Sequence, residues 1–262
     1  MTSKLLIMAV MAASLPAALS AQSNRELSDQ QHSWAVFTGT HRISDRWALY
    51  TEYQWRRADG LNHWQQSLLR AGMEYKFNQY ITAMVGYAWI ETFPYGDFPV
   101  AIRTPEHRIW QQVAVQQELG RFTLQHRYRL EQRYSGKVTS GDDGTPAIDG
   151  AEYTNRIRYR ILANISLDES VMAKARWFLS FSEETFISFG KHVGKNILDQ
   201  NRLYGGIGYQ VKPGRTIQAG YLNQLIAKAD GIHFENNHTI QISFNWTMDF
   251  SISSGNKSGS HS

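Results

Sequence analysis

The chain has 262 residues, a formal net charge of +4 at pH 7, a mean hydropathy of −0.44 and no cysteine. The absence of thiols excludes disulfides, thiolate metal sites and a lipid-modified N-terminal cysteine. Beyond the N-terminal region, no apolar run approaches the roughly 20 residues that a membrane-spanning helix needs. Aromatic residues nevertheless make up 13% of the chain. A polar average with many aromatics is typical of membrane β-barrels, whose strands are only half apolar.

The N-terminus predicts export from the cytoplasm. Lys4 supplies positive charge, residues 5–19 are almost entirely apolar, and residues 18–21 offer small side chains for cleavage before Gln22. The apolar part is short and runs directly into polar sequence, which favours a cleaved signal peptide over a retained anchor. We expect a signal peptide over 1–21, a folded barrel over 22–250 and a flexible Ser/Gly-rich tail over 251–262.

Along the mature chain, apolar and polar residues alternate in a series of segments. This period of two indicates β-strands, because successive side chains of a strand point to opposite faces of the sheet. One clear example places Trp47, Leu49, Tyr53 and Trp55 on a single face. The expected strands are 31–43, 47–56, 63–77, 80–92, 106–119, 121–134, 151–165, 171–184, 202–211, 216–226 and 238–250.

The connections between these segments alternate between tight turns and long polar loops. Turns near 44–45, 78–79 and 212–214 contrast with loops over 93–105 and 135–150. Outer-membrane barrels have short periplasmic turns and longer extracellular loops. The expected strands also reach about ten residues, the length that a tilted strand needs to cross a bilayer. We therefore predict an all-β fold, a closed antiparallel up-and-down transmembrane β-barrel.

The strand number is ambiguous in the sequence. Eleven segments conflict with the even strand numbers of bacterial single-chain barrels. Counting the short alternating piece 186–189 as a separate strand gives twelve, whereas removing a wrongly assigned terminal strand gives ten. We expect about twelve strands, with ten as the alternative.

The strongest pattern covers residues 121–165, where one face is apolar and the other carries a row of arginines. In a transmembrane barrel the apolar face meets lipid and the polar face lines the interior. We expect a lumen network or an anion-binding site there. Its candidate residues are Arg127, Arg129, Glu131, Arg133, Arg156, Arg158, Arg160, Arg176 and Arg202.

These arginines support two interpretations. In the first, guanidiniums bridge carboxylates on neighbouring strands and fill the interior, because buried charges are normally paired. In the second, arginines outnumber glutamates, and the surplus cations bind a small anionic solute or line an anion path. The expected partners are therefore outer-membrane lipid and a small anionic solute. No motif indicates nucleic-acid binding, and the sequence leaves the oligomeric state open.

Four motifs carry a resemblance to a known family: HRYRLEQR at 126–133, NRIRY at 155–159, DQNRLYGGIGY at 199–209 and GYLNQ at 220–224. Together they resemble a domain-of-unknown-function family of secreted bacterial proteins regarded as outer-membrane barrels. The resemblance extends from about Trp34 to Phe250. It implies a fold and an outer-membrane location, and it implies neither an activity nor site residues.

The sequence contains no constellation typical of catalysis or metal binding. In membrane-embedded lipid hydrolases a histidine activates a serine, but none of the nine histidines here is followed by serine two residues later. Spacing gives no support to a distant pair such as Ser180 and His192. The scattered histidines predict no metal site and no cofactor. The glycines at 205–208 lie within a strand pattern and open no helix, so they form no phosphate loop.

The sequence therefore predicts a protein of the outer membrane of a double-membraned bacterium. Its expected role is non-enzymatic, as a structural barrel or a narrow pore with an Arg/Glu-lined interior. The alternative is a lipid-modifying or lipid-hydrolysing barrel enzyme. A third class, a soluble periplasmic β-sandwich that binds ligands, requires the apolar strand faces to pack against each other.

Overall fold

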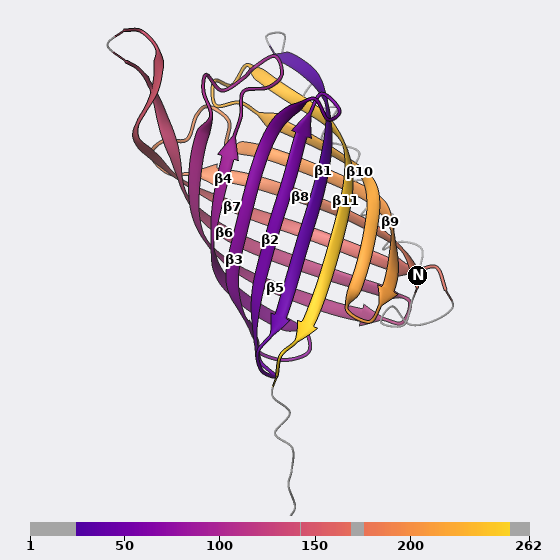
Figure 1. Ribbon diagram of the computed structural model, residues 1–262. Coiled ribbons are helices and arrows are strands. Elements are labelled where there is room, and N and C mark those ends of the chain that lie inside the picture. The colour runs from indigo at the N-terminus through magenta and orange to yellow at the C-terminus, as the bar shows by residue number, and fades with distance from the viewer. Residues whose placement is uncertain (1–24, 142, 169–175, 252–262) are drawn as a thin grey trace, which may run out of the picture.

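The computed structural model describes residues 25–141, 143–168 and 176–251, which form a closed β-barrel (Figure 1). Each strand pairs with its neighbours in the sequence, and β1 pairs with β11 to close the barrel. Among the described residues, no helix is long and apolar enough to cross a membrane. The strands are β1 (Glu26–Arg42), β2 (Trp47–Ala58), β3 (His63–Lys76), β4 (Ile81–Thr92), β5 (Thr104–Leu119), β6 (Phe122–Ser140), β7 (Pro146–Ser166), β8 (Trp177–Phe189), β9 (Leu198–Lys212), β10 (Arg215–Ala227) and β11 (His233–Asp249).

The alternation in the sequence places successive side chains in turn on the outer surface and in the interior of the barrel. On β4, Val85, Tyr87 and Trp89 face outward and are exposed, whereas Ala88 and Ile90 face inward and are buried. On β6 and β7 most outward residues are likewise apolar or aromatic, with Gln132 and Asn155 as polar exceptions, and the inward residues are largely charged. The predicted all-β barrel is confirmed. The apolar strand faces do not pack against each other, so the sandwich alternative is wrong.

The described residues contain eleven strands, one fewer than the expected twelve. The piece at 186–189 is the C-terminal end of β8 and not a strand of its own. With an odd number, the first and last strands run in the same direction. The β1–β11 pair is therefore parallel, from Glu26 opposite His233 to Arg42 opposite Asp249, and every other pair is antiparallel.

The hairpin of β6 and β7 extends farther than the sequence indicated. Residues 135–150 were expected to be a loop, but the two strands continue to pair beyond a register shift, with Val138 opposite Ile148. The extended hairpin projects past the neighbouring strands at one end of the barrel (Figure 1). Each arm supplies the other's hydrogen-bond partners, so the pairing overrides the Gly- and Asp-rich composition.

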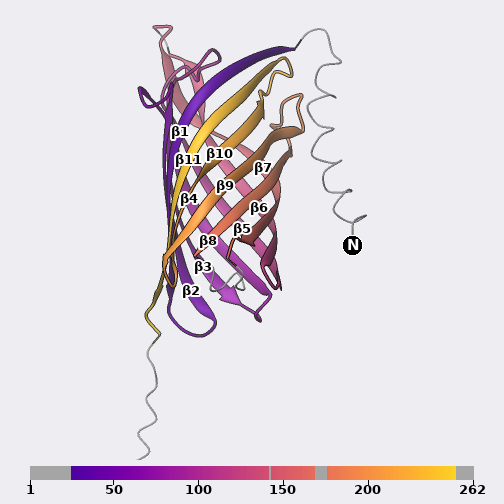
Figure 2. The same ribbon diagram turned by 90° about the vertical axis from the view of Figure 1, so that its right-hand side faces the viewer.

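The two ends of the barrel differ in their connections (Figure 2). The short connections 43–46, 77–80, 120–121 and 213–214 lie at the end where β11 finishes, here called the turn end. The connections 59–62, 93–103, 141–145, 190–197 and 228–232 lie at the opposite, loop end. The predicted signal peptide over 1–21 and all of the predicted tail except Ser251 fall outside the described residues.

The interior has an apolar side and a charged side. Leu68, Met84, Ala88, Ile90 and Trp110 form a buried cluster on β3, β4 and β5. Gly72 and Gly86 lie opposite each other on β3 and β4, and a side chain at Gly86 would collide with the Trp110 ring. This cluster fills one side of the lumen, so the arginines of β6 and β7 face a restricted space.

Candidate functional site: an arginine-lined lumen

Strands β6 and β7 place six charged side chains on one lumen wall. The register sets Glu131 opposite Arg156, Arg129 opposite Arg158 and Arg127 opposite Arg160. Residues directly opposite on antiparallel strands have Cβ atoms about 4.5–5.5 Å apart, and opposed like charges are destabilising. Two of these three pairs are arginine against arginine, so the wall needs carboxylates from elsewhere in the sequence.

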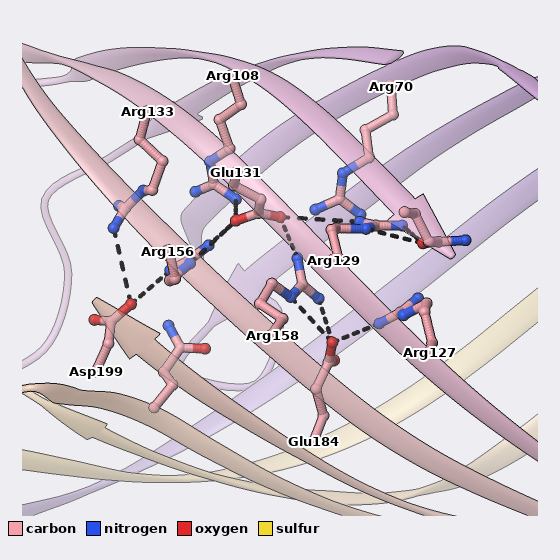
Figure 3. Close-up of polar contacts among 12 residues, drawn as sticks. Arg70, Arg108, Arg127, Arg129, Glu131, Arg133, Arg156, Arg158, Glu184 and Asp199 are labelled. Carbon is pink, nitrogen blue, oxygen red and sulfur yellow. Dashed lines mark hydrogen bonds and ion pairs between the residues drawn. The ribbon is translucent and has the colours of Figure 1, made fainter. Parts of the chain in front are cut away.

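Glu131 is the centre of the network (Figure 3). Its side chain is completely buried, and Arg156 donates to Oε2 through Nη2 at 2.7 Å and Nε at 3.0 Å. Arg158 Nη1 donates to Oε1 at 2.6 Å. Arg108 and Arg129 lie slightly farther away, at 3.6 and 3.9 Å. Such charge-assisted bonds compensate the large desolvation cost of a buried carboxylate.

Glu184 on β8 is the second anchor. It accepts hydrogen bonds from Arg158 Nη2 at 2.8 Å and Nε at 3.0 Å, and it also forms an ion pair with Arg127. Arg158 therefore bridges Glu131 and Glu184 (Figure 3). The bridge ties β6, β7 and β8 together inside the barrel.

Two further carboxylates, Glu106 and Asp199, extend the network, and like Glu184 neither is among the nine candidate residues. Glu106 accepts from Arg133 Nε at 2.7 Å and Nη2 at 3.0 Å, and it also pairs with Arg108. Asp199 accepts from Arg156 Nη1 at 2.7 Å. Glu106 could have been found from its alternation with Arg108. Asp199 could not, because it is the extra residue at a register shift between β8 and β9, which disturbs the inward–outward alternation.

Three lumen arginines lack a carboxylate partner among the described residues. Arg56 donates to Gln54 Oε1 at 2.9 Å and to Gln66 Oε1 at 2.6 Å. Arg160 Nη2 donates to Gln125 Oε1 at 2.9 Å. Arg202 contacts the Trp34 and Phe186 rings, and Gln224, with its amide oxygen turned toward Arg202, accepts from Nη2 at 3.0 Å. Amide oxygens satisfy the donors of these arginines without neutralising their charge.

Two cavities lie within the lumen. The lower cavity, toward the turn end, has a volume of about 370 Å³ and is lined by six arginines and three glutamates. The upper cavity, toward the loop end, has a volume of about 290 Å³ and is lined by seven arginines and Lys228 against Glu106 and Asp199. Arg70, Arg158 and Arg202 line both cavities. Positive charge therefore predominates on both sides of the network.

The connection 93–103 forms the outer wall of the upper cavity, to which it contributes Tyr95, Phe98 and Val100. Tyr95 Oη donates to Glu235 Oε2 at 3.1 Å, and its ring meets the ring of His32 edge-on. Lys228 Nζ donates to the carbonyl oxygen of Phe98 at 3.2 Å. These contacts hold the connection against β1, β11 and the connection 228–232, and they narrow the lumen at the loop end.

The structure places eight of the nine candidate residues around the two cavities or between them. Arg176 is the exception: it precedes β8, is exposed at the turn end and contacts the ring of Tyr209. Its expected lumen position was wrong because the strand begins only at Trp177. Glu118 and Glu152, also inward by the alternation, are exposed near strand ends and take no part in the network.

The one distant pair considered for catalysis, Ser180 and His192, is not brought together. Ser180 is buried in the lower cavity, whereas His192 is exposed in the connection 190–197 at the loop end. Within the described part of the chain, no serine hydroxyl is hydrogen-bonded to a histidine. No three His, Asp or Glu side chains there are clustered closely enough to hold a metal ion.

Comparison with known proteins places this barrel in a family. The model of the family described as "Protein of unknown function (DUF2490)" matches residues 31–236. The chain belongs to this family. The resemblance carried by the four sequence motifs is thereby confirmed. No curated protein matches the chain. Among solved structures, the chain is similar to a structure of the NanC porin. The two share 7% sequence identity, the TM-score is 0.48, and the match covers 80% of this chain and 91% of the porin chain.

Proposed function

We propose that the protein is an outer-membrane β-barrel that acts as a narrow, anion-selective pore without catalysis. In this proposal, residues 1–21 direct export and are removed, and the barrel then inserts with its turn end in the periplasm. The observation that carries the proposal is the contrast between a cationic lumen and an apolar exterior on the same strands. Ten arginines line the lumen cavities, against Glu131 and five lining carboxylates.

The exterior supports insertion into a bilayer. Leu69, Val85, Ile109 and Tyr128 are each between 46% and 53% exposed on the outer face of consecutive or adjoining strands. Soluble monomers rarely expose contiguous apolar patches of more than a few hundred Å². A membrane removes such a surface from water.

Substitution of an outward-facing leucine by arginine tests the membrane placement. Leu69 lies on β3, and Leu61 is similarly exposed, at 57%, in the connection between β2 and β3. In lipid vesicles we expect Leu69→Arg to destabilise the barrel by about 2–4 kcal/mol, the cost of arginine near the bilayer midplane. Leu61→Arg should have little effect. Equal effects at the two positions would place the Leu69 surface outside the bilayer.

The charge of the lumen supports anion selectivity. Fixed guanidiniums in a space with low-dielectric walls raise the local concentration of anions and repel cations. The Glu131 network and the connection 93–103 restrict the lumen at two levels, so the pore should be narrow. Arg56 and Arg202 are the best-placed selectivity residues, because each lacks a carboxylate partner among the described residues.

Single-channel recording in a planar bilayer under a KCl gradient tests this function. We expect small conductance steps and a reversal potential that indicates preference for chloride. Arg202→Gln should shift the reversal potential toward zero. Arg215→Gln is the matched control, because Arg215 lies at the turn end and contacts the outward Trp246 ring. Absence of conductance, or preference for potassium, would contradict the proposal.

A further inference from the structure

Four arginines form a block on the wall of the lower cavity. Arg127 faces Arg160 across β6 and β7, and Arg129 faces Arg158 one pair farther along. All four side chains line the same cavity. Placing like charges directly opposite each other on two successive pairs is unfavourable unless anions lie among them.

The protein supplies anions to only part of this block. Arg158 is paired with both Glu131 and Glu184, and Arg127 is paired with Glu184. Arg129 donates to Gln112 Oε1 through Nε at 3.0 Å and Nη2 at 2.6 Å, and its Nη1 is 3.9 Å from Glu131. Arg160 donates only to the neutral Gln125 in the described structure. Arg129 therefore has only a long ion pair, and Arg160, although it lies opposite Glu184 in the strand register, forms no ion pair with a carboxylate in the described structure.

Unsatisfied donors gather around the same cavity. Arg127 Nε, Arg129 Nη1, Arg160 Nε and the Tyr204 hydroxyl are buried without a hydrogen-bond partner in the described structure. All four residues line the lower cavity. Buried polar groups in native proteins are nearly always hydrogen-bonded, and orphaned groups commonly mark an ordered water or ion. Small rearrangements of these long side chains would turn their donors toward an occupant.

We propose that the lower cavity binds a small oxyanion with two negative charges, of the phosphate or sulfate class, between Arg127, Arg129 and Arg160. A tetrahedral oxyanion offers several acceptor oxygens to planar guanidiniums, which bind phosphate through paired hydrogen bonds. Ser180 and Ser182 line the cavity and present hydroxyls to the remaining oxygens. Chloride has no such directional geometry and binds less tightly.

The cavity is larger than a single inorganic anion requires. Its volume of about 370 Å³ lies near the lower end of the range of small-molecule pockets, about 300–1,000 Å³. The occupant is therefore either free phosphate or sulfate, or the phosphoryl group of a small organic phosphate. The remaining lining includes Leu162 and Leu222, which can contact a short organic group.

This inference deepens the proposed pore function. It rests on that function in one respect, because anions must be able to enter the lumen. The test measures the thermal stability of the protein in different salts and not its ionic conductance. Folded barrels commonly resist unfolding by detergent until boiled, so the folded fraction can be measured on gels after heating at increasing temperatures. Purified protein is heated in sodium phosphate, sodium sulfate or sodium glycerol phosphate, and in sodium chloride at equal ionic strength.

We expect phosphate to raise the midpoint temperature in a saturable manner, whereas chloride should not. Arg160→Gln should weaken phosphate binding by about tenfold, the loss expected for a charge-assisted hydrogen bond. Arg160→Lys should restore part of the affinity, because it keeps the charge without the planar fork. Arg215→Gln, outside the lumen, should bind phosphate like the unmodified protein. The unboiled gel mobility verifies that each variant is folded.

The outcomes separate this inference from the proposed function. A phosphate shift lost in Arg160→Gln, in a protein that does not conduct, supports the site and contradicts the pore. Anion conductance without any difference between phosphate and chloride supports the pore and overturns the site. A shift that persists unchanged in Arg160→Gln also overturns it. A stronger shift with glycerol phosphate than with inorganic phosphate assigns the site to an organic phosphate.

Discussion

Arg158 and Arg160 are two residues apart on β7 and face the same lumen, yet their surroundings differ. Both side chains line the lower cavity, but Arg158 is buried between Glu131 and Glu184 and donates to both, whereas Arg160 donates to a neutral amide. The strand register even sets Arg160 directly opposite Glu184, but that carboxylate bonds to Arg127 and Arg158. An arginine in this lumen is thus structural where a carboxylate forms an ion pair with it, and it is available to a ligand where none does.

The largest expected effect is at the centre of the paired region. Glu131→Gln removes the anion that Arg156 and Arg158 share and leaves buried guanidiniums uncompensated. Removing one partner of a buried ion pair costs about 3–5 kcal/mol. We expect a loss of this size in urea unfolding monitored by tryptophan fluorescence. Glu152→Gln, on the exposed part of the β6–β7 hairpin, is the control and should be neutral. A stable Glu131→Gln variant would mean that water hydrates the centre of the network.

Arg158→Gln should have an intermediate effect. It removes hydrogen bonds to two buried carboxylates, but Arg156 still holds Glu131 and Arg127 still holds Glu184. Hydrogen bonds to charged groups contribute about 1.5–3 kcal/mol, and we expect a loss in this range in the same unfolding assay. Loss of stability as large as that of Glu131→Gln would show that Arg158 alone organises the network.

Arg160→Gln should have the smallest effect on stability, a loss below about 1.5 kcal/mol, the upper end of the usual net contribution of one hydrogen bond. It removes a bond to Gln125 and at the same time relieves the repulsion from Arg127 across the strands. The same variant should shift the reversal potential under a KCl gradient toward zero. A loss of stability of more than about 1.5 kcal/mol without any change of reversal potential would contradict the proposed difference, because Arg160 would then be structural like Arg158.

Much of the fold could be predicted from local patterns. The alternation in 121–165 correctly distinguished Leu124 and Tyr128, which face outward, from Arg127 and Arg129, which face the lumen. The prediction that Arg176 faces the lumen was wrong because β8 begins only at Trp177, so the alternation of a strand does not apply to Arg176. Strand boundaries depend on partners elsewhere in the chain, as the extension of β6 and β7 through a Gly-rich segment also illustrates.

The sequence by itself determined which side chains point inward, because the two-residue period of a strand is a local property of the backbone. Only the tertiary structure decided the parallel seam between β1 and β11, the inward turn of Asp199 and the placement of the connection 93–103 over the upper cavity. It also decided which arginines are paired. Which carboxylate a guanidinium pairs with depends on the distance and angle between the two groups. Barrel closure and strand register set these distances, and no local pattern encodes them.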